Sequence, residues 1–525
     1  MNTVMTFTSK LEELFAKLEA FFANMGVNMV VTLATIAVYL LGMILIGVKF
    51  GKNNNTTGEF YLGGRKLGPL VTAMSAEASD MSSWLLMGLP GLALAGGFAE
   101  ATWTAIGLAI GTYINWLIVA KRLRRYTAET KSDTVPDFFS NRFADKSGAL
   151  LAISAIIIVI FFVPYTASGF SAIGKLFNSL FGVNYHIAMI VGAAVIVLYT
   201  VLGGFMAVST TDFVQSIVMT IALFVIICFG MNQAGSLDTV IKNINDYQGY
   251  FSLTANGAYG ALPIASTLAW GLGYFGMPHI LLRFMAIEDE NKLKTSRRVA
   301  SVWVVISMAM AIFIGIVGYT FVWQEGNILQ DGFDAERIIV YMANAIKEVG
   351  PLAAVVAGLI LAGILAATMS TADSQLLAAS SSVSENIVHR FFWKNMSVKA
   401  SIWISRLTVC VIAIIGMFFA WNENSSVFRI VSFAWAGFGA AFGPLVLFAL
   451  FWKRTTKWGA LAGVVSGGAM VFIWKFLIAP IGGVFAIYEL LPAFVISSVL
   501  IVVVSLLTKK PDDEVIATFE RVRAK

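Results

Sequence analysis

Charged residues are scarce in this chain. Of its 525 residues only 13% are charged, whereas 58% are hydrophobic, and the mean hydropathy is +0.81. A soluble globular domain carries about 25% charged residues, so this chain cannot cover a surface that faces water. The composition excludes a soluble multidomain protein and a disordered chain. It predicts a membrane protein with many spans.

Cysteine and histidine are also nearly absent. The two cysteines, Cys228 and Cys410, lie in apolar runs, where a structural disulfide framework is implausible. The three histidines, His186, His279 and His389, form no cluster with the spacing of metal ligands. The sequence also offers no paired nucleophile and base and no phosphate-binding loop. We therefore expect neither an enzyme nor a bound cofactor.

Long apolar stretches recur along the whole chain. Crossing a hydrocarbon core of ~30 Å takes about 20 helical residues, and thirteen stretches meet this length. The predicted spans are 27–48, 69–95, 101–120, 148–173, 185–205, 207–230, 258–282, 299–323, 350–384, 400–421, 427–452, 458–477 and 487–508.

Basic residues are distributed unevenly between the loops. Most of the 36 lysines and arginines lie in the loops that follow odd-numbered spans, or in the tail after the last span. Arg283 is assigned to this group, whereas Lys175 is assigned to a loop on the other side of the membrane. By the positive-inside rule, the amino terminus is outside and the carboxyl terminus is cytoplasmic. Topology thus accounts for the net charge of +6, and we expect no nucleic-acid partner.

We expect a multi-pass protein of the plasma membrane that contacts the lipid bilayer and functions as a monomer.

The amino-terminal segment 1–26 does not resemble a signal peptide, because it has no basic region followed by a compact apolar core. Ser9 and Glu12 have the spacing of a capping box. Apolar residues from Leu11 to Phe22 then recur at helical spacing. The segment is predicted to be an extracellular amphipathic helix on the outer leaflet.

Acidic residues occur where lipid should exclude them. Asp80, Asp212 and Asp373 lie in three different predicted spans, and Glu77 accompanies Asp80. A charge at the bilayer centre costs several kcal/mol, so such residues usually face a cavity or a partner. The pattern favours a cation pathway. For Asp212, which lies near the start of its span, a solvated position at the interface is the alternative.

Two of the predicted spans are poor continuous helices. The segment 75–84 is rich in small polar residues and is followed by Pro90, and the segment 270–278 holds three glycines and ends in proline. An interrupted membrane helix frees backbone groups that can bind ions and substrate. Close helix packing is the alternative role for the glycines. The two segments are five spans apart, as expected if each opens a five-helix repeat.

The ninth predicted span carries a row of small and hydroxyl side chains. Ala367, Ser370, Thr371 and Ser374 follow the spacing i, i+3, i+4, i+7 and share one helix face, and Asp373 lies beside Ser370. In an isolated helix such hydroxyls would bridge helices or bond to their own backbone. Beside a broken helix they favour a hard cation with oxygen ligands, for which sodium is the natural candidate.

These residues resemble the solute:sodium symporter family, and within it the proline carriers. The likeness runs from about residue 27 to about residue 508. The segments that carry it are Tyr61–Arg65 (YLGGR), Ala78–Ser82 (ASDMS), Trp84–Gly91 (WLLMGLPG), Trp270–His279, Leu365–Thr371 and Phe433–Pro444 (FAWAGFGAAFGP).

The resemblance implies an all-α membrane protein with a leucine-transporter-like core of two inverted five-helix repeats and accessory helices. The implied divisions are 27–68, the first span and a cytoplasmic loop; 69–230, the first repeat; 231–257, an extracellular loop; 258–452, the second repeat; 453–508, two accessory spans; and 509–525, a cytoplasmic tail.

The resemblance also implies a sodium site between the second and ninth spans. The carbonyls of Ala78, Met81 and Ala367 and the hydroxyls of Ser370 and Thr371 would form it.

Further residues match positions linked to sodium in the family. Asp80 and Asp212 match acids that handle sodium. Asp212, Asp373 and Ser374 fall where some relatives bind a second sodium, and we expect a possible second site there.

The resemblance implies a substrate cavity lined by Ser82, Trp84, Tyr165, Trp270, Tyr274 and Pro278. Amide and hydroxyl donors at a broken helix suit the carboxylate of L-proline, and aromatic faces suit its ring and cationic amine. The expected function is sodium-coupled import of L-proline by alternating access. The alternative is another small organic solute, such as a sugar, sialic acid, choline or a vitamin. Glu77 and Ser83 depart from the pattern of the proline carriers.

Overall fold

The computed structural model describes residues 25–51, 56–244, 249–257, 259–324 and 332–524. The described part of the chain is helical and contains no β-strand, apart from one isolated β-bridge between Leu67 and Ile287. The predicted amphipathic helix at 1–26 lies almost entirely outside the described residues.

Ten helical segments of the described chain are long and apolar enough to cross a membrane. They are α2 (Val27–Gly51), α6 (Phe98–Ile114) continuing through η3 (Asn115–Val119) into α7 (Ala120–Glu129), α9 (Ala149–Phe181), the second part of α10 (Tyr185–Ala234), α14 (Leu293–Gln324), α16 (Pro351–Ser381) continuing into η9 (Ser382–Phe392), α17 (Val398–Phe419), α18 (Val427–Phe451), α19 (Lys457–Ile473) with η10 (Trp474–Ile478), and α20 (Leu490–Leu507).

The three remaining predicted spans are helical but interrupted or short. The second span consists of α4 (Pro69–Asp80), η2 (Trp84–Gly88) and α5 (Leu89–Gly96), and the seventh consists of α12 (Ala261–Leu268), η5 (Ala269–Gly276) and α13 (Pro278–Ala286). The fifth is the first part of α10, which ends where Gly204 adopts φ 67°. Only glycine adopts that conformation readily, so the chain turns there and opens the next span.

Short helices lie between the spans and after the last of them. They are α3 (Thr57–Leu62), η1 (Gly63–Arg65), α8 (Val135–Arg142), α11 (Leu237–Ile244), η4 (Ala255–Gly257), η6 (Glu290–Lys292), η8 (Ala335–Arg337), α15 (Ile338–Glu348), η11 (Ala479–Ile481), η12 (Gly483–Phe485) and α21 (Asp513–Ala524). The carboxyl-terminal helix α21 buries Val515, Phe519 and Val522. The guanidinium of Arg142 lies 5.0 Å from the Phe519 ring. The charged tail therefore docks on the bundle.

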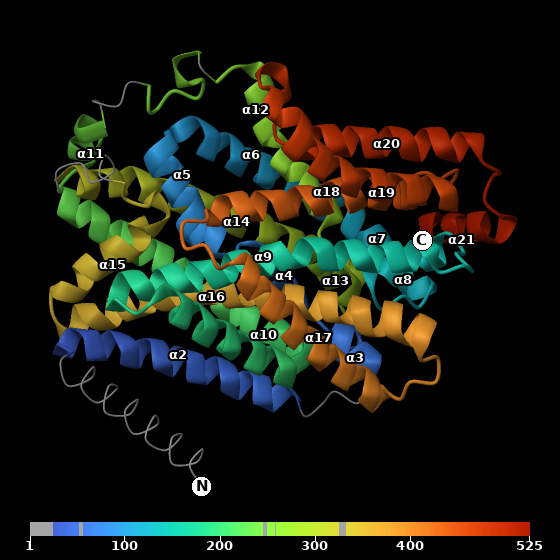
Figure 1. Ribbon diagram of the computed structural model, residues 1–525, viewed down its shortest axis with the longest axis horizontal. Coiled ribbons are helices and arrows are strands. Elements are labelled where there is room, and N and C mark those ends of the chain that lie inside the picture. The colour runs from blue at the N-terminus through green and yellow to red at the C-terminus, as the bar shows by residue number, and fades with distance from the viewer. Residues whose placement is uncertain (1–24, 52–55, 245–248, 258, 325–331, 525) are drawn as a thin grey trace, which may run out of the picture.

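The bundle has a buried centre and lipid-facing edges. In Figure 1, α16 and α9 run through the middle of the molecule, α2 lies along one edge, and α19 and α20 lie along the opposite edge. Burial agrees with this arrangement. In the most apolar stretch of α16, 72% is buried inside the protein, whereas in the most apolar stretch of α2 only 17% is buried. Ser370 and Asp373 of α16 therefore lie deep in the bundle.

Lys175 lies in a helix and not in the loop that the sequence predicted for it. It is buried in α9, where its Nζ lies 2.8 Å from Asp334 and 3.0 Å from Glu336. Glu336 also accepts hydrogen bonds from the backbone N–H of Val427 and Phe428, the first turn of α18, as expected for an acid at a helix amino terminus. Lys175 is thus part of a buried ion pair and carries no information on topology.

A polar cavity of about 690 Å³ opens between α3, α8 and η9. Asp137 lies on its wall, where it accepts a hydrogen bond of 2.8 Å from the Asn386 amide and forms a capping box with Thr134. Burial raises the pKa of Asp137 to about 6. Tyr61 and Glu385 also line this cavity, and none of the predicted site residues is among those that do.

Candidate functional site

The second span is broken at the position expected from its composition. Helix α4 ends at Asp80, and Met81 leaves the helical region with φ −79° and ψ 67°. The N–H of Met81 still bonds to the Glu77 carbonyl, whereas the N–H of Ser82 bonds to the Asp80 carbonyl at 2.9 Å. The irregular backbone is buried among other helices, an environment in which a membrane protein tolerates it.

The seventh span is broken as well. Its middle is the 3-10 segment η5, and the chain then becomes extended at Met277, with ψ 110°, before Pro278 starts α13. Glycine serves close packing here in addition. A Cβ at Gly271 would overlap the Gly107 carbonyl, and a Cβ at Gly276 would overlap the Phe438 carbonyl. The seventh span is therefore interrupted, and its glycines also allow close helix packing.

The hydroxyl face of α16 packs against the break in α4. Ser370 Oγ donates to the Ala78 carbonyl at 2.7 Å and lies 3.2 Å from the Ala367 carbonyl. The hydroxyl of Thr371 donates to the same Ala367 carbonyl at 3.2 Å. Four of the five predicted sodium ligands thus share one small volume, and Met81 lies buried at the break beside them. The atoms predicted to bind sodium are all neutral oxygens, the type that hard cations prefer.

Asp80 faces the seventh span. Its Oδ2 accepts a hydrogen bond of 2.6 Å from the Tyr274 hydroxyl. Its backbone carbonyl accepts bonds from Trp84 Nε1 at 3.1 Å and from the Tyr165 hydroxyl at 3.4 Å. Asp80 therefore connects the two broken spans and α9, and it holds three of the predicted substrate residues together.

Aromatic rings continue from this point along η5. The rings of Trp84 and Trp270 are 6.3 Å apart, and Tyr274 lies edge-on to Trp435 at 5.1 Å. Trp435 Nε1 donates to the Trp270 carbonyl at 2.7 Å. Tyr488 stacks on Trp270 at 5.1 Å.

Sequence reasoning did not assign Trp435 and Tyr488 to this wall. Trp435 lies in the segment Phe433–Pro444, which was noted for its resemblance only. Tyr488 had no local signal, because it lies just before α20 at the start of the predicted span 487–508 and reaches Trp270 only through packing.

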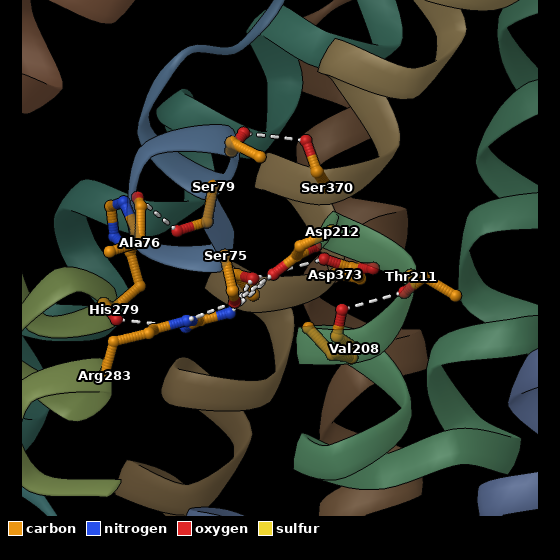
Figure 2. Close-up of polar contacts among 12 residues, drawn as sticks. Ser75, Ala76, Ser79, Val208, Thr211, Asp212, His279, Arg283, Ser370 and Asp373 are labelled. Carbon is orange, nitrogen blue, oxygen red and sulfur yellow. Dashed lines mark hydrogen bonds and ion pairs between the residues drawn. The ribbon is translucent and has the colours of Figure 1, made fainter. Parts of the chain in front are cut away.

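Asp212 pairs with a buried arginine. Its Oδ2 lies 3.0 Å from Arg283 Nη2 and accepts a bond of 2.7 Å from Ser75 Oγ (Figure 2). The same Nη2 donates to Ser374 Oγ at 2.6 Å, and Nη1 donates to the His279 carbonyl. Arg283 is not the loop cation expected from the sequence, because α13 continues to Ala286 and buries it. Asp212 likewise is not solvated at an interface.

Asp373 and Ser374 lie next to this ion pair. The Tyr199 hydroxyl donates to Asp373 Oδ2 at 2.8 Å and lies 2.9 Å from the Met369 carbonyl. Ser374 Oγ lies 3.3 Å from Asp373 Oδ1. The three residues predicted for a second sodium are thus gathered, and an arginine side chain is bonded to two of them. A second sodium there stays a prediction.

All fifteen predicted site residues are buried. They are Ala78, Asp80, Met81, Ser82, Trp84, Tyr165, Asp212, Trp270, Tyr274, Pro278, Ala367, Ser370, Thr371, Asp373 and Ser374.

The comparisons with known proteins agree with this geometry. The model of the sodium:solute symporter family matches residues 60–467. The sodium/proline symporter of Haemophilus influenzae is 43% identical over 93% of this chain and 97% of its own length. The osmoregulated proline transporter OpuE of Bacillus subtilis is 41% identical over 93% and 96%.

A solved structure of a Na⁺-coupled sialic acid symporter, in a substrate-bound outward-open state, superposes with a TM-score of 0.77. It is 19% identical and covers 92% of this chain and 99% of that chain, so this likeness shows the fold. The leucine-transporter-like fold expected from the sequence is confirmed, as is the resemblance, and the protein is a multi-pass membrane transporter rather than an enzyme. This chain belongs to the sodium:solute symporter family.

Proposed function

We propose that this protein imports L-proline together with sodium by alternating access. The observation that carries the proposal is the contact between Ser370 of α16 and the carbonyl of Ala78 at the break in α4. It places the hydroxyl face of one span on the freed backbone of another, a geometry that suits a monovalent metal ion. The relatives at 41–43% identity are named as proline carriers, which supports this solute.

In this proposal sodium binds to the carbonyls of Ala78, Met81 and Ala367 and the hydroxyls of Ser370 and Thr371. Because these atoms belong to α4 and α16, the ion holds the two helices in one relative position. Asp80 is on the same break and bonds to Tyr274, so ordering of α4 by sodium also orders the aromatic wall. Sodium then raises the affinity for the solute, and the solute raises the affinity for sodium by the same factor.

The solute would lie between Ser82, Trp84, Tyr165, Trp270, Tyr274 and Pro278. Trp435 and Tyr488 extend this wall, because they contact Trp270 directly. Flat aromatic faces suit the pyrrolidine ring, and an ammonium group over such a face is favoured. Hydroxyl and amide groups at the break suit the carboxylate.

The sodium gradient drives the cycle. One elementary charge crossing 100 mV supplies about 2.3 kcal/mol, enough for more than tenfold accumulation of solute. The repeats 69–230 and 258–452 would rock against each other around the site. We place the amino terminus outside and the carboxyl terminus in the cytoplasm of a plasma-membrane protein that works as a monomer.

The ion pair between Arg283 and Asp212 bears on the second sodium predicted at Asp212, Asp373 and Ser374. The guanidinium bonds to both Asp212 and Ser374, so it already supplies a positive charge at the position considered for a second ion. A measured ratio of one would reject the second sodium.

The decisive experiment is uptake of labelled proline into proteoliposomes with an imposed sodium gradient. We expect accumulation that requires sodium, that collapses with the gradient, and that unlabelled proline abolishes. Absence of labelled-proline uptake, together with sodium-dependent uptake of a labelled sugar, sialic acid, choline or vitamin, would assign a different solute. Equal uptake without sodium would contradict sodium coupling.

A further inference from the structure

A cavity of about 350 Å³ lies where α20 ends and where α19 and α21 begin. It is lined by the turn after α8, the first residues of α19, the segment 508–512 and the first turn of α21. In Figure 1 this place is the end of the edge formed by α19 and α20, beside α21. None of the predicted site residues is among the described residues that line it, so the proposed transport mechanism does not use this cavity.

Polar contacts hold the walls of this cavity together. Arg454 Nη2 donates to the Thr508 carbonyl at 2.8 Å, and the hydroxyls of Thr456 and Thr508 are 2.8 Å apart. These bonds fix the end of α20 against the start of α19. On the other side, the buried apolar face of α21 and the ion pair of 2.8 Å between Lys453 and Glu520 hold that helix in place. The cavity is therefore preformed, which lowers the entropy that a ligand loses on binding.

The cavity carries an excess of positive charge. Among the described residues that line it, three are lysines and one, Asp512, is an acid; the acids in the first turn of α21 are not lining residues. Lys457 is already paired, because its Nζ lies 2.8 Å from Asp145. Lys509 and Lys510 are exposed, and neither forms an ion pair or a side-chain hydrogen bond within the described chain. With Asp512 counted against these two lysines, one positive charge has no counter-charge.

Apolar side chains that face the lipid border the same cavity. Trp458 lines it and is 60% exposed, and Leu506 and Leu507, which directly precede the segment 508–512, are 59% and 81% exposed. All three lie at the ends of spanning helices, at the depth of the membrane–water interface, where tryptophan is enriched. A ligand that neutralises the lysines and continues along the leucines is therefore amphipathic and anionic.

We propose that this cavity binds the headgroup of an anionic phospholipid of the cytoplasmic leaflet. The phosphodiester of such a lipid balances the unmatched charge at Lys509 and Lys510, and its acyl chains lie along Leu506 and Leu507. Basic pockets between membrane helices on the cytoplasmic side bind headgroups of this kind. Sodium and the solute have no part in this site, and only the choice of leaflet rests on the proposed orientation of the chain.

The test is lipid binding by the purified, delipidated full-length protein in detergent, measured by native mass spectrometry. Phosphatidylglycerol, which is anionic, and phosphatidylcholine, which is zwitterionic, are titrated separately with identical acyl chains. One unmatched positive charge near an anionic lipid changes the affinity by roughly fivefold, so the first phosphatidylglycerol should bind at least about fivefold more tightly than the first phosphatidylcholine. A large excess of inorganic phosphate should not displace it, because phosphate has no acyl chains.

The double variant Lys509→Gln/Lys510→Gln removes both free charges and keeps two long polar side chains. Its affinity for phosphatidylglycerol should fall about 30-fold, two factors of roughly five, so that this lipid is no longer preferred. The matched control is Lys294→Gln/Lys399→Gln, which removes two exposed lysines from other loops on the same side. Neither of these forms an ion pair or a side-chain hydrogen bond in the described part of the chain, and the control should keep the wild-type affinity.

A wild-type protein that binds the two lipids equally well overturns the inference, whatever the variants do. So does an unchanged affinity in Lys509→Gln/Lys510→Gln, or an equal loss in the control pair, because the latter would show a general attraction of lysines to anionic lipid. Displacement of phosphatidylglycerol by inorganic phosphate overturns the lipid assignment in favour of a free anion. Sodium-coupled uptake is measured separately, so failure of the lipid site and failure of the proposed function are distinguishable.

Discussion

Replacing Ser370 by alanine tests the contact on which the sodium site depends. The hydroxyl lies 2.7 Å from the Ala78 carbonyl and 3.2 Å from the Ala367 carbonyl. The substitution removes one proposed ligand and leaves the helix intact, because alanine is the best helix former. The break in α4 should persist.

The magnitude follows from two opposing contributions. A polar contact to a charged group contributes about 1.5–3 kcal/mol, and the neutral hydrogen bond to Ala78 that the sodium-free protein loses offsets about 1 kcal/mol of this. About 0.5–2 kcal/mol remains. At about 1.4 kcal/mol for each factor of ten, the sodium concentration for half-maximal uptake should rise about 2- to 30-fold in Ser370→Ala.

Labelled-proline uptake at a series of sodium concentrations, in proteoliposomes held at constant ionic strength, measures this value. Thr368→Ala is the matched control, because the Thr368 hydroxyl lies on the same helix and donates only within it, to the Ile364 carbonyl at 2.9 Å. Thr371→Ser keeps its hydroxyl and should stay near the wild type. An unchanged sodium dependence in Ser370→Ala, or an equal rise in Thr368→Ala, refutes the proposed ligation.

Three further predictions follow from particular contacts. Tyr274→Phe removes the donor 2.6 Å from Asp80 Oδ2, so the proline concentration for half-maximal uptake at saturating sodium should rise about tenfold or more, since such bonds contribute about 1.5–3 kcal/mol; no rise would exclude this link. Gly276→Ala places a methyl group against the Phe438 carbonyl, which should destabilise the fold by about 1–3 kcal/mol and lower the Tm of the detergent-solubilised protein. Gly260→Ala is the control, because no atom lies within 4 Å of the new Cβ, and its Tm should match the wild type. Arg283→Met leaves Asp212 buried without its cation, which should lower the free energy of unfolding by about 3–5 kcal/mol. Adding Asp212→Asn should recover part of the lost Tm. A double variant no more stable than Arg283→Met would show that the pair does not act as a unit.

Local patterns determined the number of spans and the places where two of them break. Hydropathy depends on neighbouring residues only, and glycine, proline and serine weaken a helix wherever they stand, so the interruptions near Ala78 and before Pro278 were readable in advance. The spacing of Ser370 and Thr371 was readable too, because the period of a helix decides which side chains share a face.

Tertiary packing decided which partners these groups meet. The Ser370 hydroxyl bonds to a carbonyl 292 residues away, and Asp212 pairs with an arginine that local hydropathy placed in a loop. Tyr488 joined the aromatic wall without any local signal. Such pairings depend on how whole helices cross, which is set by shape and burial summed over the bundle. A single stretch of sequence therefore indicates that a buried charge needs a partner, and only the fold shows that Arg283 is that partner for Asp212 and that Glu77 accepts a hydrogen bond from the Trp116 indole.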